Sequence, residues 1–442
     1  MAQEIRDQKD QVGETPRPER PPAARDKEVD AALGSAAAVV ATDLRSYARA
    51  WMSRIRAGES GVLPVVIGLV AICVIFQVQN SLFLSAGNLT NLLVQGAFFM
   101  LLGMAEIFVL LLGEIDLSLG FVAGLSGVVV AELVVEQRGW PWWAAVIVAL
   151  TCSTAIGLLQ GTLVTRLRLP SFVVTLGGLL FWEGLMIRVL GTGGTIPIPS
   201  NVINDIANGT LTAVAGWVVM IVVLGGFAAL TLFRDARRRM QKLVTPPLSL
   251  TLLRIGLVAA AGIALILICN TNRGVLVPIR GVPWVVLVVL ATLGAWSFLL
   301  GRTRFGRYVY AIGGNAEAAR RAGVSLAGIR TAAFALAGLT AGIAGIVYAS
   351  RLRSVSTSID GGTLVLYSVA AAVIGGTSLF GGRGKPLHAV LGGIVIAAIY
   401  NGMGLLGMSA ATQYMVTALV LLAAVTVDAV ARRGKVEVNP GR

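Results

Sequence analysis

Long apolar runs alternate with short polar segments along most of the chain. Each run is about 18 to 24 residues long, which is the length that an α-helix needs to cross roughly 30 Å of hydrocarbon. The pattern therefore predicts an all-α polytopic membrane protein with about twelve transmembrane helices. The expected spans are 62–79, 89–112, 119–135, 142–165, 171–190, 213–233, 251–269, 283–300, 331–350, 363–380, 387–404 and 412–430.

Composition agrees with a membrane-embedded chain. Hydrophobic residues make up 56% of the 442 residues and charged residues only 13%, and a soluble domain cannot bury that much apolar surface at ordinary proportions. The 53 glycines suit helices that pack closely through small side chains in a bilayer. The three cysteines lie inside apolar runs, and His388 is the only histidine. We therefore expect neither a disulfide framework nor a metal site.

The distribution of lysine and arginine predicts which side of the membrane each loop faces. With the N-terminus in the cytoplasm, 29 of the 36 basic residues fall in inside segments, five fall outside and two fall within spans. Both termini are therefore expected in the cytoplasm. The net charge of +14 is explained by this asymmetry, so we expect no nucleic acid as a partner.

The two ends of the chain are more polar than its middle. Residues 1–45 are rich in Pro, Arg, Asp and Ala, which favours a disordered tail. Residues 44–57 predict either a basic amphipathic helix that lies on membrane lipid at the inner leaflet or a simple solvated lead-in to the first span. We expect a cytoplasmic tail at 1–58, a transmembrane domain at 59–431 with a cytoplasmic loop at 301–330, and a second tail at 432–442.

The stretch GGNAEAARRAG, residues 313–323, is polar although long apolar runs flank its loop. Asn315 is a good helix N-cap, and Gly323 stands where a helix reverses. Glu317 falls in the first turn and Arg320 with Arg321 in the last, where their charges complement the helix dipole. The spacing predicts a two-turn helix over 316–322.

Three alanines of this helix, Ala318, Ala319 and Ala322, share one face by i,i+3 and i,i+4 spacing. A face of such small side chains lets the helix lie very close in a groove on another protein. An ordinary amphipathic surface helix is the alternative interpretation that the residues alone leave open.

The stretch GEIDLSLG, residues 113–120, places two carboxylates between apolar runs with no basic residue beside them. An ionised carboxylate in hydrocarbon is costly, so Glu114 and Asp116 should face water, pair, or bind backbone donors. The glycines, Asp116 and Ser118 also suit a helix break that Asp or Ser recaps. We interpret Glu114 as part of a turn between two spans, and Asp116 with Ser118 as part of a discontinuous helix that lines a translocation path.

Motifs for catalysis are absent from the sequence. There is no phosphate-binding loop, because GGRGKP at 381–386 lacks both the spacing and the hydroxyl, and there is no HExxH, CxxC or GxSxG motif. Transport or signalling is therefore favoured over catalysis, and any ATP must be bound by another chain.

Three ordered blocks resemble one branch of the ATP-binding-cassette (ABC) importer permeases. The residues Glu317-Ala318-Ala319, three more residues and then Gly323 match the EAA-x3-G pattern, which in those permeases forms the coupling helix that docks into the ATPase subunit. The blocks at 302–323, 113–120 and 373–384 are similar to those of ribose and xylose permeases, in which GGIDLS-G and GGTSLFGG recur. The resemblance covers about 60–430. Two extra spans and a basic loop within 205–282 resemble the xylose-type members, since the usual permease of this branch has about ten spans.

The resemblance implies the membrane subunit of an ATP-driven importer for a monosaccharide, a pentose such as xylose, in the bacterial inner membrane. Its partners would be a second permease copy, two ATPase domains and an extracytoplasmic sugar-binding protein. The permease itself would be neither an enzyme nor the holder of a cofactor, because ATP binds to the partner. The implied coupling helix comprises Asn315, Glu317, Ala318, Ala319, Arg320, Arg321 and Gly323.

A sugar needs a path lined by uncharged hydrogen-bonding groups rather than by a ladder of charges. Asn91, Gln95 and Asn401 suit this role beside Asp116 and Ser118, although each amide could equally be a hydrogen bond between helices. Two rival hypotheses stay open: an ion-coupled secondary sugar transporter, with Glu106 or Asp116 as its titrating carboxylate, and a structural or signalling membrane protein.

Overall fold

The computed structural model describes residues 63–436 except 242, 244, 275–277 and 358–360. The predicted tail at 1–58 and the last residues of the predicted tail at 432–442 lie outside this range. The helices are α4 (Leu63–Gln79), α5 (Ala86–Leu110), α6 (Leu119–Val134), α7 (Trp142–Arg166), α8 (Ser171–Leu190), α9 (Asn201–Asn208), α10 (Ala213–Met240), α11 (Leu248–Asn270), α12 (Trp284–Arg302), α13 (Arg304–Gly314), α14 (Ala316–Arg321), α15 (Leu326–Leu352), α16 (Gly361–Ile374), α17 (Pro386–Leu405) and α18 (Ala410–Val436). Two short strands, β1 (Thr195–Pro197) and β2 (Ser354–Ser356), complete the fold.

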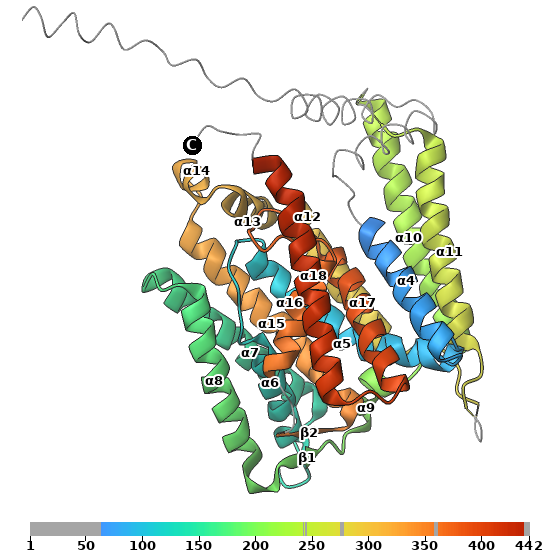
Figure 1. Cartoon of the computed structure of the whole chain (residues 1–442), viewed down its shortest axis with the longest axis vertical. Helices are drawn as coiled ribbons and strands as arrows, with labels where there is room; N and C mark the ends of the chain where they lie inside the picture. Colours follow the sequence, from blue (N-terminus) through green and yellow to red (C-terminus); the bar gives the residue numbers. More distant parts are fainter. Residues whose placement is uncertain (1–62, 242, 244, 275–277, 358–360, 437–442) are drawn as a thin grey trace, which may run out of the picture. The chain divides into compact units, whose positions relative to one another are not determined.

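Each expected span coincides with one helix (Figure 1). Within the described residues, eight helices are long and apolar enough to cross a membrane, and four shorter apolar helices correspond to the remaining expected spans. One expected span extends several residues beyond its helix, because α16 ends at Ile374 rather than near 380. Gly376 has a φ of 105°, and this left-handed backbone stops the helix.

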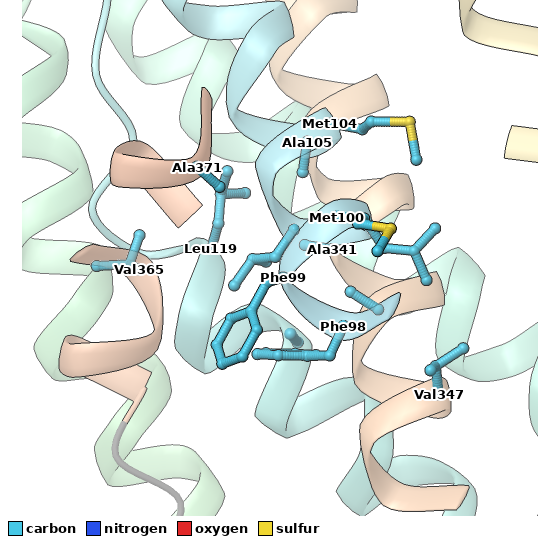
Figure 2. Packing of buried hydrophobic residues seen from close by; sticks show 14 of the residues in the cluster. Phe98, Phe99, Met100, Met104, Ala105, Leu119, Ala341, Val347, Val365 and Ala371 are labelled. Carbon is cyan, nitrogen blue, oxygen red and sulfur yellow. The ribbon is translucent and has the colours of Figure 1, made fainter. Parts of the chain in front are cut away.

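Helix α5 lies in the core of the bundle and packs against α15, α16 and α17. Its side chains Phe98, Phe99 and Met100 belong to the same buried cluster as Ala341 and Val347 of α15 (Figure 2). From Gly96 to Leu110 every residue of α5 is buried. A helix that is apolar and buried on all sides is held by its neighbours rather than by one amphipathic face.

Small residues bring the core helices into close contact, as the glycine content predicts. A Cβ added to Gly157 of α7 would lie 2.2 Å from the carbonyl oxygen of Phe334 on α15. A Cβ added to Gly338 of α15 would lie 2.3 Å from the carbonyl oxygen of Ser153 on α7. Both distances are shorter than van der Waals contact, so this helix pair needs glycine at both positions.

The short helices α6 and α16 meet at their N-termini. A Cβ added to Gly120, the second residue of α6, would lie 2.0 Å from the carbonyl oxygen of Gly361, the first residue of α16. The segment that precedes α6 returns into the interior, since Asp116 and Ser118 are fully buried. The segment is exposed at Gly113 and partly exposed at Glu114 and Ile115, and it enters the interior at Asp116.

Strands β1 and β2 pair antiparallel, with Ile196 opposite Val355. Beside them α9 packs on α15, where the hydroxyl of Ser350 accepts a hydrogen bond of 2.9 Å from the amide of Ala207. These contacts join the segment after α8 to the segment after α15.

Helices α10 and α11 belong to the two extra spans, and residues 231–253 at their connected ends belong to a different compact unit from the rest of the two helices. In this unit the hydroxyl of Thr251 donates a hydrogen bond of 2.7 Å to the carboxylate of Asp235. In the larger unit a second apolar cluster comprises Leu211, Ile266, Cys269 and Val282. Leu93 of α5 and Val286 of α12 also pack against this cluster, so it is shared between the extra helices and their neighbours.

Candidate coupling segment and translocation path

Helix α14 has the two ends that the sequence predicts. The side chain of Asn315 accepts a hydrogen bond of 2.9 Å from the amide of Ala318. At the other end Gly323 has a φ of 81°. The amide of Gly323 donates a hydrogen bond of 3.0 Å to the carbonyl of Arg320, and the amide of Val324 donates one of 3.0 Å to the carbonyl of Ala319. These two bonds form a Schellman motif. The helix ends at Arg321, and the next residue is its C-cap.

The carboxylate of Glu317 is bound by two arginines of its own helix. Its carboxylate accepts hydrogen bonds of 2.7 and 2.9 Å from Arg320 and one of 3.1 Å from Arg321. These hydrogen bonds, with Arg320 as the larger contributor, hold the pKa of Glu317 below its ordinary value. The three side chains are exposed, so α14 presents a charged, ordered surface.

One of the three alanines that the sequence places on a shared face of α14 does not lie on the exposed face. Ala319 is only 5% exposed and belongs to the main hydrophobic cluster, whereas Ala318 and Ala322 are exposed. In a helix Ala319 lies about 100° from Ala318, and this rotation turns it toward the chain's own core. The exposed surface of α14 therefore combines Ala318 and Ala322 with the charged side chains.

The loop that carries α14 contains a second helix, α13, that the sequence analysis missed. The side chain of Thr303 caps its N-terminus by accepting a hydrogen bond of 3.3 Å from the amide of Gly306. Val309 and Ile312 are buried, and the hydroxyl of Tyr310 donates a hydrogen bond of 2.7 Å to the carbonyl of Gly384. The i,i+3 spacing of Val309 and Ile312 after a threonine is the signal that could have predicted this helix.

The three blocks that carry the family resemblance meet at one point. A Cβ added to Gly313, at the end of α13, would lie 1.8 Å from the carbonyl oxygen of Leu111 and 2.5 Å from the amide nitrogen of Gly382. The amide of Gly382 in turn donates a hydrogen bond of 2.9 Å to that same carbonyl of Leu111. We call these contacts the glycine junction. It joins the α13–α14 loop to the segments that follow α5 and α16.

Helices α5 and α16 end in the same way. Gly113 follows α5 with a φ of 76°, and Gly376 follows α16 with a φ of 105°. In both cases the next amide reaches back by five residues, from Glu114 to Val109 at 3.1 Å and from Thr377 to Ala372 at 3.0 Å. The two helices therefore end with the same backbone geometry, at the first residue of GEIDLSLG and at the second residue of GGTSLFGG.

The turn side chains of the two motifs also match. Asp116 accepts a hydrogen bond of 2.9 Å from the amide of Ser118, and Ser378 accepts one of 3.0 Å from the amide of Phe380. Each acceptor is the fourth residue of its motif, and each bond spans two residues, as in Asx- and ST-turns.

Glu114 lies 3.5 Å from the guanidinium of Arg330 near the start of α15. The carboxylate and guanidinium side chains are 16% and 30% exposed. The pair connects the segment after α5 to the helix that follows α14. The sequence interpretation of Glu114 as part of a simple turn missed this partner, because the two residues are far apart in the chain.

A buried polar cluster surrounds the N-terminus of α6. Ser118 donates a 2.6 Å hydrogen bond to Asp116 and accepts one of 2.8 Å from the amide nitrogen of Gln160 on α7. Thr175 of α8 donates to the carbonyl of Ile115 at 3.3 Å. The structure thus brings the predicted pair, Asp116 and Ser118, together with Gln160 and Thr175, which the sequence analysis left outside the site.

Trp182 on α8 lies against the same cluster. A Cβ added to Gly178 would lie 2.3 Å from Nε2 of Gln160, 3.2 Å from Nε1 of Trp182 and 3.4 Å from Cβ of Ser118. Gly178 therefore leaves the space in which these three side chains converge. We call Asp116, Ser118, Gln160 and Trp182 the α6 polar cluster.

The other predicted path residues lie elsewhere. Asn91 is exposed, Gln95 is buried on α5, and Asn401 accepts a hydrogen bond of 2.8 Å from the side chain of Asn88. This bond connects α17 to α5 and gives Asn401 the helix-joining role that the sequence left as its alternative. Of the five residues predicted to line the path, Asp116 and Ser118 therefore belong to the α6 polar cluster, whereas Asn91, Gln95 and Asn401 do not.

The sequence has clear relatives among transport proteins. A family model described as "Branched-chain amino acid transport system / permease component" matches residues 88–425. The xylose transport system permease protein XylH of Escherichia coli K12 is 36% identical over 373 residues, which cover 84% of this chain and 92% of XylH. The ribose import permease protein RbsC of the same organism is 30% identical over 364 residues, which cover 81% and 92%. Its D-allose transport system permease protein AlsC is 28% identical over 346 residues, which cover 78% and 84%. No solved structure matches the chain significantly.

Proposed function

Because the chain belongs to the permease family of branched-chain amino acid transport systems, we propose that it is the membrane subunit of an ABC importer that carries a monosaccharide into the cytoplasm. Family membership and the apolar helices make it a multi-pass protein of the bacterial inner membrane, with a transport role rather than a catalytic one. Its relatives are named for xylose, ribose and allose, which are all monosaccharides. The 36% identity to the xylose permease supports a pentose such as xylose as the substrate.

The partners follow from the importer class. ABC importers work with ATPase subunits and with a substrate-binding protein, and this permease leaves ATP binding to the ATPase. Two copies of the permease form the membrane channel in this proposal. Twelve helices cross the membrane, with the tails at 1–58 and 432–442 and the loop at 301–330 in the cytoplasm. The asymmetry of basic residues supports this orientation.

The proposed coupling mechanism rests on the contacts of the glycine junction. Helix α14 docks into the ATPase through its exposed surface, and closure of the two ATPase domains moves it. Because Gly313 touches both Leu111 and Gly382, the movement reaches the segments that follow α5 and α16. The first of these segments leads to Asp116 and Ser118 at the start of α6. A displacement at the ATPase thereby moves the helix break and opens the path beside it.

Vesicles separate this proposal from an ion-coupled transporter. The permease is reconstituted with its ATPase and sugar-binding protein, and uptake of labelled xylose is measured in two conditions. ATP on the ATPase side without an ion gradient should drive uptake. Imposed proton or sodium gradients without ATP should not, and gradient-driven uptake that ignores ATP would overturn the proposal.

A further inference from the structure

The α6 polar cluster contains hydrogen-bonding groups that have no partner among the described residues. One carboxylate oxygen of Asp116, Oδ2, is fully buried without a hydrogen bond, and so is the indole Nε1 of Trp182. Asp116 is 0% exposed and Trp182 only 9%. A buried polar group without a partner costs roughly 1–3 kcal/mol, so two of them in one buried cluster point to a further hydrogen-bonding partner.

The rest of the cluster already forms a chain of hydrogen bonds. Gln160 donates to Ser118, and Ser118 donates to Asp116. Each of these groups can exchange its present bond for one to a hydroxyl of similar geometry, because amides, hydroxyls and carboxylates all pair with hydroxyl groups. Gly178 contributes no side chain at the point where Nε2 of Gln160, Nε1 of Trp182 and Cβ of Ser118 converge.

We propose that the α6 polar cluster binds a neutral polyhydroxylated molecule, a monosaccharide, with Asp116 and Gln160 accepting and donating to its hydroxyls and the Trp182 indole donating to one of its oxygens. The assignment rests on the proposed function and names where in the permease its sugar binds. Gln160 and Trp182 are the residues that it adds to the path, and Asn91, Gln95 and Asn401 are not part of it.

The chemistry of the cluster selects among ligand classes. Asp116 disfavours an anion, and Glu106, which interacts electrostatically with Asp116, adds a second acidic group nearby. The described residues contain no group of three or more His, Cys, Asp or Glu side chains that could hold a metal ion. The indole N–H is a donor only, and therefore suits an oxygen of a sugar and not a cation.

Direct binding to the assembled transporter tests the site. The permease–ATPase complex is placed in nanodiscs without the sugar-binding protein, and binding of radiolabelled xylose is measured at millimolar concentrations. The wild-type complex should bind saturably. Trp182→Phe retains the ring but removes the N–H, and loss of one neutral hydrogen bond should raise the Kd about 3- to 10-fold.

Trp296→Phe is the matched control. The Nε1 of Trp296 on α12 is likewise buried without a hydrogen bond among the described residues, but its ring packs edge-on against Phe108 of α5. Its variant should bind xylose as the wild type does. Equal binding in both tryptophan variants, or an equal loss in both, would overturn the site.

Three further outcomes have defined meanings. Saturable binding of labelled sodium that Asp116→Asn abolishes, with xylose binding unchanged, would overturn the sugar assignment in favour of a cation. Absence of xylose binding to a complex that still shows ATP-driven uptake would overturn the site alone. Loss of ATP-driven uptake in the wild-type vesicles would instead contradict the proposed function.

Discussion

Gly323 ends α14 in a backbone conformation that side chains with a Cβ adopt only at a cost. Its φ is 81°, and a Cβ at this position would meet no atom within 4 Å. Any effect of substitution there must therefore come from the backbone and not from crowding. This separation makes Gly323 a clean test of whether the turn after α14 matters for transport.

Replacement of Gly323 by valine should strain the turn by about 1–2 kcal/mol, since β-branched residues disfavour the left-handed region. We expect the permease to reach the membrane but to lose most of the ATPase stimulation by the sugar-loaded binding protein. Gly323→Asn is the control, because asparagine tolerates this conformation. Normal stimulation in the valine variant would mean that the turn has no part in coupling.

Ala318 and Ala319 are neighbours with opposite surroundings. Ala318→Trp adds a large side chain to the exposed surface of α14, so the loop should fold normally and fail to dock on the ATPase. Ala319→Trp instead forces the ring into a packed core and should destabilise the protein by about 1–3 kcal/mol or more. Copurification of the ATPase and the thermal stability of the permease distinguish the two. Full ATPase binding by Ala318→Trp would show that this surface is not the docking face.

The helices of this chain follow from features that are local in the sequence. Apolar runs of bilayer length predict the spans, and Asn315 and Gly323 predict both ends of α14. The α6 polar cluster is different, because Ser118 and Gln160 are 42 residues apart and meet only through the packing of α6 on α7. The inward rotation of Ala319 likewise depends on which side of α14 the core occupies, and spacing alone cannot supply that.

The glycine junction offers a test of the connection between elements. Gly313 and Gly314 are adjacent, but a Cβ on Gly313 would lie 1.8 Å from the carbonyl oxygen of Leu111, whereas a Cβ on Gly314 would meet nothing within 4 Å. Gly313→Ala should therefore push the α13–α14 loop away from α5 and reduce uptake about tenfold or more, while Gly314→Ala should transport normally. Uptake assays at matched membrane abundance measure both. Equal uptake in the two variants would remove the junction from the mechanism.

On the scale of the whole molecule, the two extra helices differ from the core. Most of the apolar surface of α10 and α11 is exposed, whereas α5, α15 and α17 are largely buried. Surfaces of this kind suit contact with lipid. Helices α5, α15 and α17 therefore supply most of the packed core, and α10 and α11 suit a position against lipid.

Cysteine labelling checks the proposed orientation. In a variant without Cys73, Cys152 and Cys269, a cysteine at Arg238 should react with a membrane-impermeant reagent only from the cytoplasmic side, and one at Arg280 only from the outside. Both native side chains are exposed. Labelling of position 238 from outside would mean that α10 and α11 do not form a pair of spans.

The contact between α6 and α16 has a genetic consequence. Gly120 and Gly361 touch backbone to backbone, and glycine is already the smallest residue, so neither position can shrink to accommodate growth of the other. A defect caused by Gly120→Ala therefore has no intragenic suppressor at 361. A Cβ on Gly361 would instead lie 2.6 Å from the ring of Phe121, so a smaller side chain at 121 can suppress a defect caused by Gly361→Ala. In a selection for growth on the transported sugar, revertants of Gly120→Ala should restore the original glycine or arise at residues that let one of the helices shift as a whole.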